Sequence, residues 1–497
     1  MRKLLLTATI FYALFLLAPN YRHYPAEGLN DYLLITGHGL LSSLGLFAFL
    51  FILILNKYVW SLLLPLLSMA AGVTAFFVWQ IDISVNPALI ESIFNTHAGE
   101  ALDYLSWPLA LIALLHLLVA LGFSYWRWHT NWRGRDNLYF LAAAVMAATV
   151  FNIVNNKRVN TLSSRAPFVY YSAIKEQLQN KADSRLPRKA PGQLLHCGED
   201  SLTVVLIIGE ALRADHLQMN GYDRVTMPLM EARDVISFPN IYSPHTHTAA
   251  SLPYMLTRAQ PKLSDPMQDE HSLVQLFQEC GFRTTWLANQ NPISTFSFII
   301  NECDSSIINK PHLSDYSNTP KYDSDLLPHF KRLNAEGHAN QLIIVHIAGN
   351  HWWYNKNLPP DFHYYQPVME NKRLSPANRQ KMINSYDNVT RFTDYVIDQM
   401  LQQLDEKNAW MIFLADHGQS FGEDGKWLHA NDAPQEQNPA SFAWFSDKYI
   451  KSHSEKVAQL TKNRLDTTDT AFLFHTLLQG SGIKTDRYEE QWDLFVP

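Results

Sequence analysis

Long apolar segments dominate the first 154 residues and restrict what this part of the chain can form. Five of them approach or reach the length that crosses the hydrocarbon core of a bilayer as a helix. They lie at 4–18, 32–55, 59–78, 104–126 and 138–154. Because lipid offers no partner to backbone N–H and C=O groups, such segments fold into helices. The sequence therefore predicts a multi-pass α-helical membrane domain at 1–154.

Basic residues near the ends of these segments indicate their orientation. Arg2 and Lys3 precede the first segment, Lys57 follows the second, and Arg133 and Arg135 lie between the fourth and the fifth. Positively charged loops are retained in the cytoplasm, so the N-terminus is expected inside. Five spans that begin inside end outside. The C-terminal half is therefore expected to be exported, most simply into a periplasm.

The exported part begins with a connecting segment at 155–200 and continues as a globular domain at 201–497. Aromatic and aliphatic residues at 168–179 are interleaved with Lys175 and Glu176, which suits an amphipathic helix on the outer membrane surface. A helix packed on the globular domain is the alternative. The net charge of −6 and the lack of a Lys/Arg stripe give no reason to expect nucleic-acid binding.

Three short apolar segments of the globular domain end in residues that can bind a metal ion. Segment 202–208 leads to Glu210, 342–348 to His351, and 409–415 to Asp416 and His417. Continuous apolar strands that alternate with helical patterns are typical of a largely parallel sheet covered by helices on both faces. Because the carboxyl ends of such strands share one edge, these side chains should meet. Their mixed oxygen and nitrogen ligands suit zinc.

A hydroxyl-rich segment at 243–253 contains the candidates for a nucleophile. Thr246, Thr248 and Ser251 lie among small residues, which allow a substrate to approach closely. A threonine hydroxyl is a weak nucleophile until a metal ion or a base lowers its pKa. The spacing alone does not choose among the three hydroxyls.

A more specific pattern is carried by several short segments. They are 209–216 (Gly-Glu-Ala-Leu-Arg-Ala-Asp-His), 220–228, 248–253 (Thr-Ala-Ala-Ser-Leu-Pro), 349–351, 386–388 and 416–418 up to His429. Together they resemble the motifs of the phosphoethanolamine transferases, which are membrane-anchored members of the alkaline phosphatase–sulfatase superfamily. The resemblance covers essentially the whole chain and implies an α/β domain of the alkaline-phosphatase/sulfatase type at 201–497.

The resemblance implies a zinc-dependent phosphoethanolamine transferase of the bacterial inner membrane with a periplasmic catalytic domain. The donor would be phosphatidylethanolamine, and the acceptor a sugar of lipopolysaccharide or lipooligosaccharide. Thr248 would be the nucleophile and would form a phosphothreonine. His351 and His429 would lie across the phosphate as catalytic or substrate-binding residues. The implied zinc ligands are Glu210, Thr248, Asp416 and His417.

The chain departs from the family pattern around the expected nucleophile. Pro244 and Tyr254 stand where members that act on lipid A usually carry cysteines, and 286–291 lacks their Gly-Cys-Lys pattern. These differences favour an inner-core heptose over lipid A as the acceptor. The alternative is a phosphodiesterase or a phosphoglycerol transferase of the same superfamily that acts on another envelope glycan.

Further substrate contacts are expected outside these motifs. The outer loop at 79–103 contains Thr96 and Glu100, to which the resemblance gives a role in handling the phosphatidylethanolamine headgroup. Asn289 or the nearby Asn291 is a further candidate for substrate contact.

The three cysteines of the chain all lie in the exported half, where an oxidising compartment permits disulfides. Cys280 and Cys303 would close a short loop and are the expected pair. Three free cysteines are the alternative.

Overall fold

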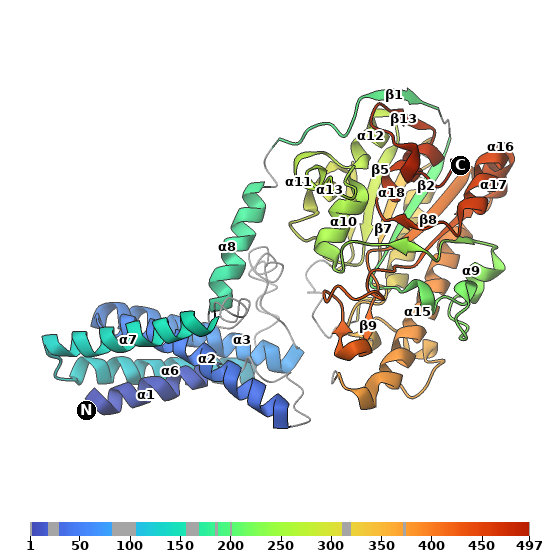
Figure 1. The fold of residues 1–497 in the computed structure, drawn as a ribbon. Helices are drawn as coiled ribbons and strands as arrows, with labels where there is room; N and C mark the ends of the chain where they lie inside the picture. Colours follow the sequence, from blue (N-terminus) through green and yellow to red (C-terminus); the bar gives the residue numbers. More distant parts are fainter. Residues whose placement is uncertain are drawn as a thin grey trace. The chain divides into compact units, whose positions relative to one another are not determined.

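The computed structural model describes residues 2–17, 29–81, 106–155, 168–183, 187–198, 201–310, 320–370 and 374–496. The chain divides into two compact units (Figure 1). The first spans Met1–Asn180, and the second comprises Lys181–Asp315 and Thr319–Pro497. The connecting helix expected at 168–179 therefore groups with the membrane helices.

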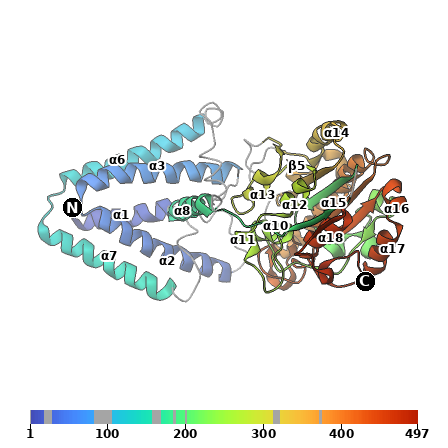
Figure 2. The ribbon, with the colours of Figure 1, turned by 90° about the horizontal axis from the view of Figure 1, so that it is seen from above.

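The first unit is entirely helical in its described part. Its helices are α1 (Arg2–Leu17), α2 (Leu29–Leu53), α3 (Lys57–Ile81), α6 (Trp107–His129), α7 (Gly134–Asn155) and α8 (Phe168–Asp183). Helix α3 packs along α6, and α2 packs along α7 (Figure 2).

Four of these helices are long and apolar enough to cross a membrane. The spanning stretches are Ile35–Leu53, Lys57–Phe77, Trp107–His129 and Gly134–Ile153. The first expected span corresponds to α1, whose apolar part Leu5–Leu17 is shorter than the other four. The multi-pass membrane domain is thus confirmed, while the fifth crossing and the orientation derived from it stay predictions.

Polar contacts fix the packing of these helices at two places. Arg127 of α6 donates from Nε to the Ile54 carbonyl oxygen at 2.8 Å, just past the end of α2. Its guanidinium also stacks on the Trp132 ring at 3.7 Å. The positive charge of Arg127 is therefore stabilised by a carbonyl oxygen and by an aromatic ring. The hydroxyl of Tyr170 in α8 donates to Thr74 Oγ1 of α3 at 2.7 Å. Helix α8 is therefore anchored to the membrane unit.

The second unit is built on a seven-stranded sheet in the order β3-β11-β8-β2-β7-β5-β6. From β8 to β6 the strands run parallel, and β11 and β3 add an antiparallel edge. The strands are β2 (Thr203–Gly209), β3 (Ile236–Ser237), β5 (Arg283–Ala288), β6 (Ser305–Ile308), β7 (Gln341–His346), β8 (Ala409–Ala415) and β11 (Ser441–Phe445).

Alternate residues of the central strand β2 point to two separate hydrophobic cores. Val204, Leu206 and Ile208 belong to one core, and Val205 and Ile207 belong to the other. All five are fully buried, which explains why the strand is a continuous apolar run rather than an alternating one. The expected α/β fold, with a largely parallel sheet covered on both faces, is confirmed.

The helices divide between these two cores. The first core is covered by α10 (Thr248–Leu256), α12 (Leu273–Glu279) and α18 (Phe472–Gly480), and the second by α14 (Leu327–Ala335) and α15 (Arg379–Leu401). The remaining helices are α9 (Pro228–Ala232), α11 (Pro266–Asp269), α13 (Ser297–Glu302), α16 (Asp447–Ser452) and α17 (Ser454–Asn463). Short strand pairs complete the unit: β1 (Leu194–Cys197) with β13 (Ile483–Thr485), β4 (Ile241–Tyr242) with β12 (Thr468–Asp469), and β9 (Ser420–Phe421) with β10 (Trp427–Leu428).

The disulfide joins Cys197 to Cys280, so the expected pairing of Cys280 with Cys303 is wrong. Cys197 ends β1, and Cys280 directly follows the last residue of α12. Cys303 remains a free thiol and donates to the Ile299 carbonyl oxygen at 3.5 Å. The bridge thus links the start of the second unit to a helix of its first core. The two bridged cysteines lie far apart in the sequence, so a short sequence separation does not identify this pair.

Candidate active site

Side chains from two neighbouring strands converge at the carboxyl edge of the parallel sheet. Glu210 directly follows β2, and Asp416 and His417 directly follow β8, which pairs with β2 in parallel register. All three are buried, and one ligand atom from each lies within 4.8 Å of the others. The convergence expected from the strand ends is therefore present for these three residues.

The hydroxyl of Thr248 lies against this carboxylate pair. Its Oγ1 donates to Asp416 Oδ2 at 2.6 Å and lies 3.2 Å from Glu210 Oε2. The other two candidate hydroxyls point elsewhere, because Thr246 bonds to Asp432 and Ser251 bonds to the His245 carbonyl oxygen. Among the three hydroxyls that the sequence leaves open, the geometry selects Thr248.

Thr248 is also the first residue of helix α10, with His247 preceding it as the cap residue. The first N–H groups of a helix have no partner within the helix, and the helix dipole places partial positive charge there. A phosphate attached to Thr248 would therefore lie where a helix stabilises an anion.

The donor set fits a divalent metal ion. His417 Nδ1 bonds to the Gly418 carbonyl oxygen at 2.7 Å, which directs the lone pair of Nε2 towards Glu210 Oε1 at 3.5 Å and Asp416 Oδ2 at 3.4 Å. This Nε2 is fully buried and makes no hydrogen bond within the described part of the chain. Two buried carboxylates facing one imidazole nitrogen form the oxygen and nitrogen environment that zinc accepts.

Without a metal ion, the negative charge of the two buried carboxylates is not balanced by the neighbouring side chains. Burial, and then the neighbouring Asp416 carboxylate, raise the pKa of Glu210 to about 8. His417 and the amide of Gln290 act in the opposite direction without cancelling that rise. A cation bound between the two carboxylates would lower the pKa of both, because it favours their ionised forms.

Backbone and amide groups hold the two carboxylates in place. Asp416 Oδ1 accepts from the backbone N–H groups of Ala211 and His417 at 3.0 Å and 2.9 Å. Gln290 donates from Nε2 to Glu210 Oε2 at 3.0 Å and to the Ile347 carbonyl oxygen at 2.9 Å. The sequence analysis missed Gln290, and the available signal was its position just past β5, at the same edge of the sheet.

Two further histidines, His429 and His351, lie near His417 and near each other. His429 follows β10, and its ring centroid is 4.6 Å from that of His417. Its Nδ1 faces Gln419 Oε1 at 3.3 Å. Burial lowers the pKa of His429, and the nearby His417, His351 and His247 lower it further. His429 is therefore a neutral imidazole at neutral pH.

His351 lies in a loop that a buried carboxylate fixes after β7. Asp323 accepts from the backbone N–H groups of Ala348 and Gly349, both at 2.8 Å. Asn350 in the same loop donates from its backbone N–H to the Glu210 carbonyl oxygen at 3.2 Å. The loop that carries His351 is thus tied to the segment that carries Glu210.

Other expected substrate residues do not join this cluster. Asn289 is buried, and its amide bonds to the Lys321 carbonyl oxygen, Asp323 Oδ1 and Asn309. The amide is thus bonded within the protein, and its contact with substrate stays a prediction. Thr96 and Glu100 lie outside the residues that the structure describes.

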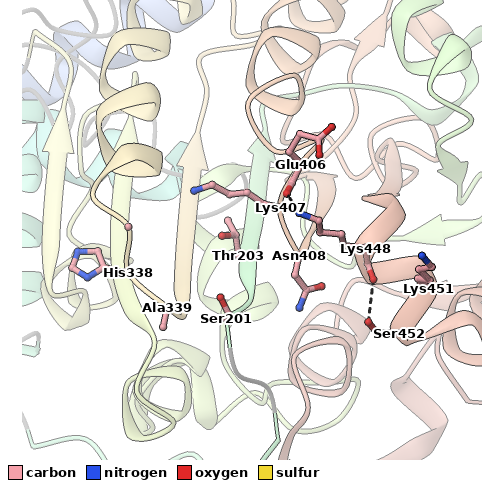
Figure 3. A pocket seen from close by; sticks show the side chains of 11 residues that line it. Ser201, Thr203, His338, Ala339, Glu406, Lys407, Asn408, Lys448, Lys451 and Ser452 are labelled. Atoms are coloured by element: carbon pink, nitrogen blue, oxygen red, sulfur yellow. Dashed lines mark hydrogen bonds between the residues drawn. The ribbon is translucent and has the colours of Figure 1, made fainter.

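A cavity of about 680 Å³ lies at the opposite edge of the sheet (Figure 3). It is lined by the first residue of β2, by the residues that precede β7 and β8, and by one side of α16. Because Glu210, Asp416 and His417 follow the carboxyl ends of β2 and β8, this cavity is separate from the catalytic edge.

Comparison with models of known protein families shows which family this chain belongs to. A model of the sulfatase family matches residues 203–483, which include Glu210, Thr248, Asp416 and His417. The chain belongs to the sulfatase family. A second model, described as phosphoethanolamine transferase EptA/EptB, matches residues 43–162. The chain is therefore a member of the phosphoethanolamine transferase branch, as its motifs predict.

Related proteins match this chain over nearly its full length. The phosphoethanolamine transferase EptA of Salmonella typhimurium is 26% identical over 484 residues, which cover 90% of this chain and 87% of that protein. The solved structure of the lipooligosaccharide phosphoethanolamine transferase EptA from Neisseria meningitidis has a TM-score of 0.70 at 21% identity, covering 99% of this chain and 97% of that one. This likeness shows that both units have the fold of that integral membrane protein.

A third comparison concerns the second unit alone. The C-terminal periplasmic domain of EptC from Escherichia coli, solved in complex with Zn, has a TM-score of 0.56 at 22% identity. It covers 63% of this chain, and 90% of that domain is matched.

Proposed function

We propose that this protein transfers phosphoethanolamine from phosphatidylethanolamine to a sugar of lipopolysaccharide or lipooligosaccharide, through a phosphothreonine at Thr248. The observation that carries the proposal is the 2.6 Å hydrogen bond from Thr248 Oγ1 to Asp416 Oδ2 beside Glu210 and His417. The names of the relatives in Salmonella and Neisseria support the transferred group and the acceptor class. The catalytic unit would act on the periplasmic side of the inner membrane.

The first half-reaction would form the phosphothreonine. Thr248 Oγ1 attacks the phosphorus of the donor, and its proton passes to Asp416 Oδ2, the nearest acceptor. The bond between phosphorus and the diacylglycerol oxygen breaks, and the leaving oxygen takes a proton from solvent, because the neutral His429 has none to give. Zinc bound by Glu210, Thr248, Asp416 and His417 would lower the pKa of the Thr248 hydroxyl and neutralise charge on the phosphate.

The second half-reaction would return Thr248 to its free form. The sugar hydroxyl attacks the phosphorus, and a neutral imidazole accepts the hydroxyl proton. His429 suits this role because its lowered pKa keeps it unprotonated. The bond between phosphorus and Thr248 Oγ1 breaks, Oγ1 regains the proton held by Asp416, and His429 releases its proton to solvent. Two half-reactions of this kind give ping-pong kinetics.

An inner-core heptose is favoured over lipid A as the acceptor. At the positions where lipid A-modifying members are expected to carry cysteines, this chain has Pro244 and Tyr254. The Tyr254 ring packs edge-on against His245 at 5.1 Å, so the nucleophile segment is braced by an aromatic contact rather than a covalent bridge. The second candidate is a phosphodiesterase or a phosphoglycerol transferase acting on another envelope glycan.

The test uses the full-length protein in vesicles that contain phosphatidylethanolamine. Intact-mass analysis should detect one added phosphoethanolamine, absent from Thr248→Ala and retained by the control Ser251→Ala, whose hydroxyl bonds to the His245 carbonyl oxygen. An adduct that persists in Thr248→Ala would refute the nucleophile. Mass spectrometry of the envelope glycolipids then identifies the acceptor, and release of phosphoethanolamine into water without an acceptor would favour the phosphodiesterase.

A further inference from the structure

The loop that carries His429 has an unusual backbone. Leu428, Ala430 and Asp432 have φ angles of 65°, 64° and 52°, so three of five successive residues occupy the left-handed region without being glycine. This region is sparsely populated by residues with a side chain, and each occupancy costs free energy. Such a segment keeps its shape only where the surroundings hold it.

Two residues, Thr246 and Glu436, hold the loop through hydrogen bonds. The backbone N–H of Ala430 donates to the Thr246 carbonyl oxygen at 3.0 Å, and Thr246 Oγ1 bonds to Asp432 Oδ1 at 3.2 Å. The backbone N–H of Asn431 donates to Glu436 Oε2 at 2.8 Å. The Asn431 amide donates to Glu436 Oε1 and to the carbonyl oxygen of His429 itself, both at 3.1 Å.

Glu436 is a buried carboxylate that the proposed reaction does not use. Its side chain is fully inaccessible, and its Oε1 also accepts from the hydroxyl of Ser420. Its backbone carbonyl oxygen accepts from the N–H of Gly418 at 2.7 Å. A single residue therefore bonds through its main chain to the segment of His417 and through its side chain to the loop of His429.

The approach of these two segments is unusually close. A Cβ atom on Gly418 would lie 2.1 Å from the Gln435 carbonyl oxygen, so only glycine allows the segment before Glu436 to pass there. The rings of His417 and His429, which lie on these two segments' neighbouring stretches of chain, are 4.6 Å apart.

We infer that Glu436 is a positioning residue, which holds the strained 428–432 loop so that His429 faces the phosphate site. The inference rests on the proposed function, because it is that function which gives His429 a proton to accept. Among the described residues, Glu436 makes no hydrogen bond to Thr248 or to the side chains of the metal-binding residues; its bonds reach Asn431, Ser420 and Gly418.

The variant that tests this inference is Glu436→Gln in the full-length protein. Glutamine keeps the shape of the side chain but replaces one acceptor oxygen by an NH₂ group, so Asn431 loses one of its two bonds to residue 436 in either orientation of the amide. Hydrogen exchange of the peptide that covers 428–432 should become roughly tenfold faster or more. The control Gln437→Ala alters a neighbouring side chain that bonds to Tyr242, and its exchange in this peptide should match that of the wild type.

A double-mutant cycle with His429→Ala tests whether Glu436 acts through His429. Glu436→Gln should lower kcat by roughly tenfold to a hundredfold in the wild-type background, as loss of an orienting partner does. In the His429→Ala background it should change kcat by less than about twofold, because coupled residues are not additive. Zinc content per protein should stay as in the wild type.

The outcomes separate the two hypotheses. Unchanged exchange at 428–432, an equal loss of kcat in both backgrounds, or a loss of zinc would each overturn the positioning role. A wild-type protein that forms no adduct on Thr248 would overturn the proposed function instead. In that case the exchange experiment still decides whether Glu436 holds the loop.

Discussion

Thr248 Oγ1 lies 2.6 Å from Asp416 Oδ2, although 168 residues separate the two in the chain. One comes from the first turn of α10, and the other from the residue after β8. The packing of the helix on the sheet thus brings together a hydroxyl and a carboxylate that lie far apart in the sequence. Their contact is the geometry on which the proposed nucleophilic reaction rests.

Replacement of Glu210 by Gln should weaken metal binding yet stabilise the metal-free protein. The change removes one of two buried carboxylates whose proximity is unfavourable without a cation. Zinc affinity, measured by competition with a chelator, should fall by at least about tenfold. The Tm of the chelator-treated variant should exceed that of the chelator-treated wild type. A lower Tm would show that the carboxylate pair is not strained.

Acid should destabilise the second unit through His475. This side chain is buried in α18, its Nδ1 accepts from the backbone N–H of Glu489 at 3.2 Å, and burial lowers its pKa from 6.5 to about 4. The unfolded chain therefore binds the proton first, so this contribution is complete above pH 6.5 and is lost as pH falls towards 4. At pH 5 the loss amounts to about 2 kcal/mol.

The check on His475 is chemical unfolding at pH 7.5 and at pH 5. His475→Gln should show a smaller drop in the free energy of unfolding between these two pH values than the wild type. An equal drop in both proteins would assign the acid sensitivity to other groups.

Reduction of the Cys197–Cys280 bridge should destabilise the second unit substantially. The bridge closes a loop with a sequence separation of 83, and loss of such a constraint costs about 4 kcal/mol in the chain-entropy description. The Tm of the wild type should fall on addition of a reductant, and that of Cys197→Ser should not. Cys303→Ser serves as the control, because it leaves the bridge and its response to reductant intact.

Helix packing in the membrane unit should depend on Gly72. A Cβ at this position of α3 would lie 2.6 Å from the ring of His116 in α6, whereas a Cβ on Gly122 of α6 would meet nothing within 4 Å. Gly72→Ala should therefore cost about 1–3 kcal/mol through overpacking. Gly122→Ala should be neutral or slightly stabilising. Thermal unfolding in detergent compares the two, and equal Tm values would rule out the close contact.

Part of the site was predictable because parallel strands end at a common edge. Glu210, Asp416 and His417 each follow a continuous apolar strand, and this pattern places them together before any coordinates are known. Gln290 follows the same rule at β5 and could have been found in the same way. Glu436 could not, because it lies in a loop, and only its bonds to Asn431 and Gly418 show what it does.

The sequence by itself determined the apolar membrane helices, the buried parallel strands and the ligand-type residues at their ends. These follow from local composition and periodicity, which act over a few residues. Only the tertiary structure decided that Thr248 rather than Thr246 or Ser251 faces the carboxylates, and that Cys280 pairs with Cys197. Both choices depend on contacts between elements far apart in the chain, where the packing of whole helices on the sheet sets which side chains meet.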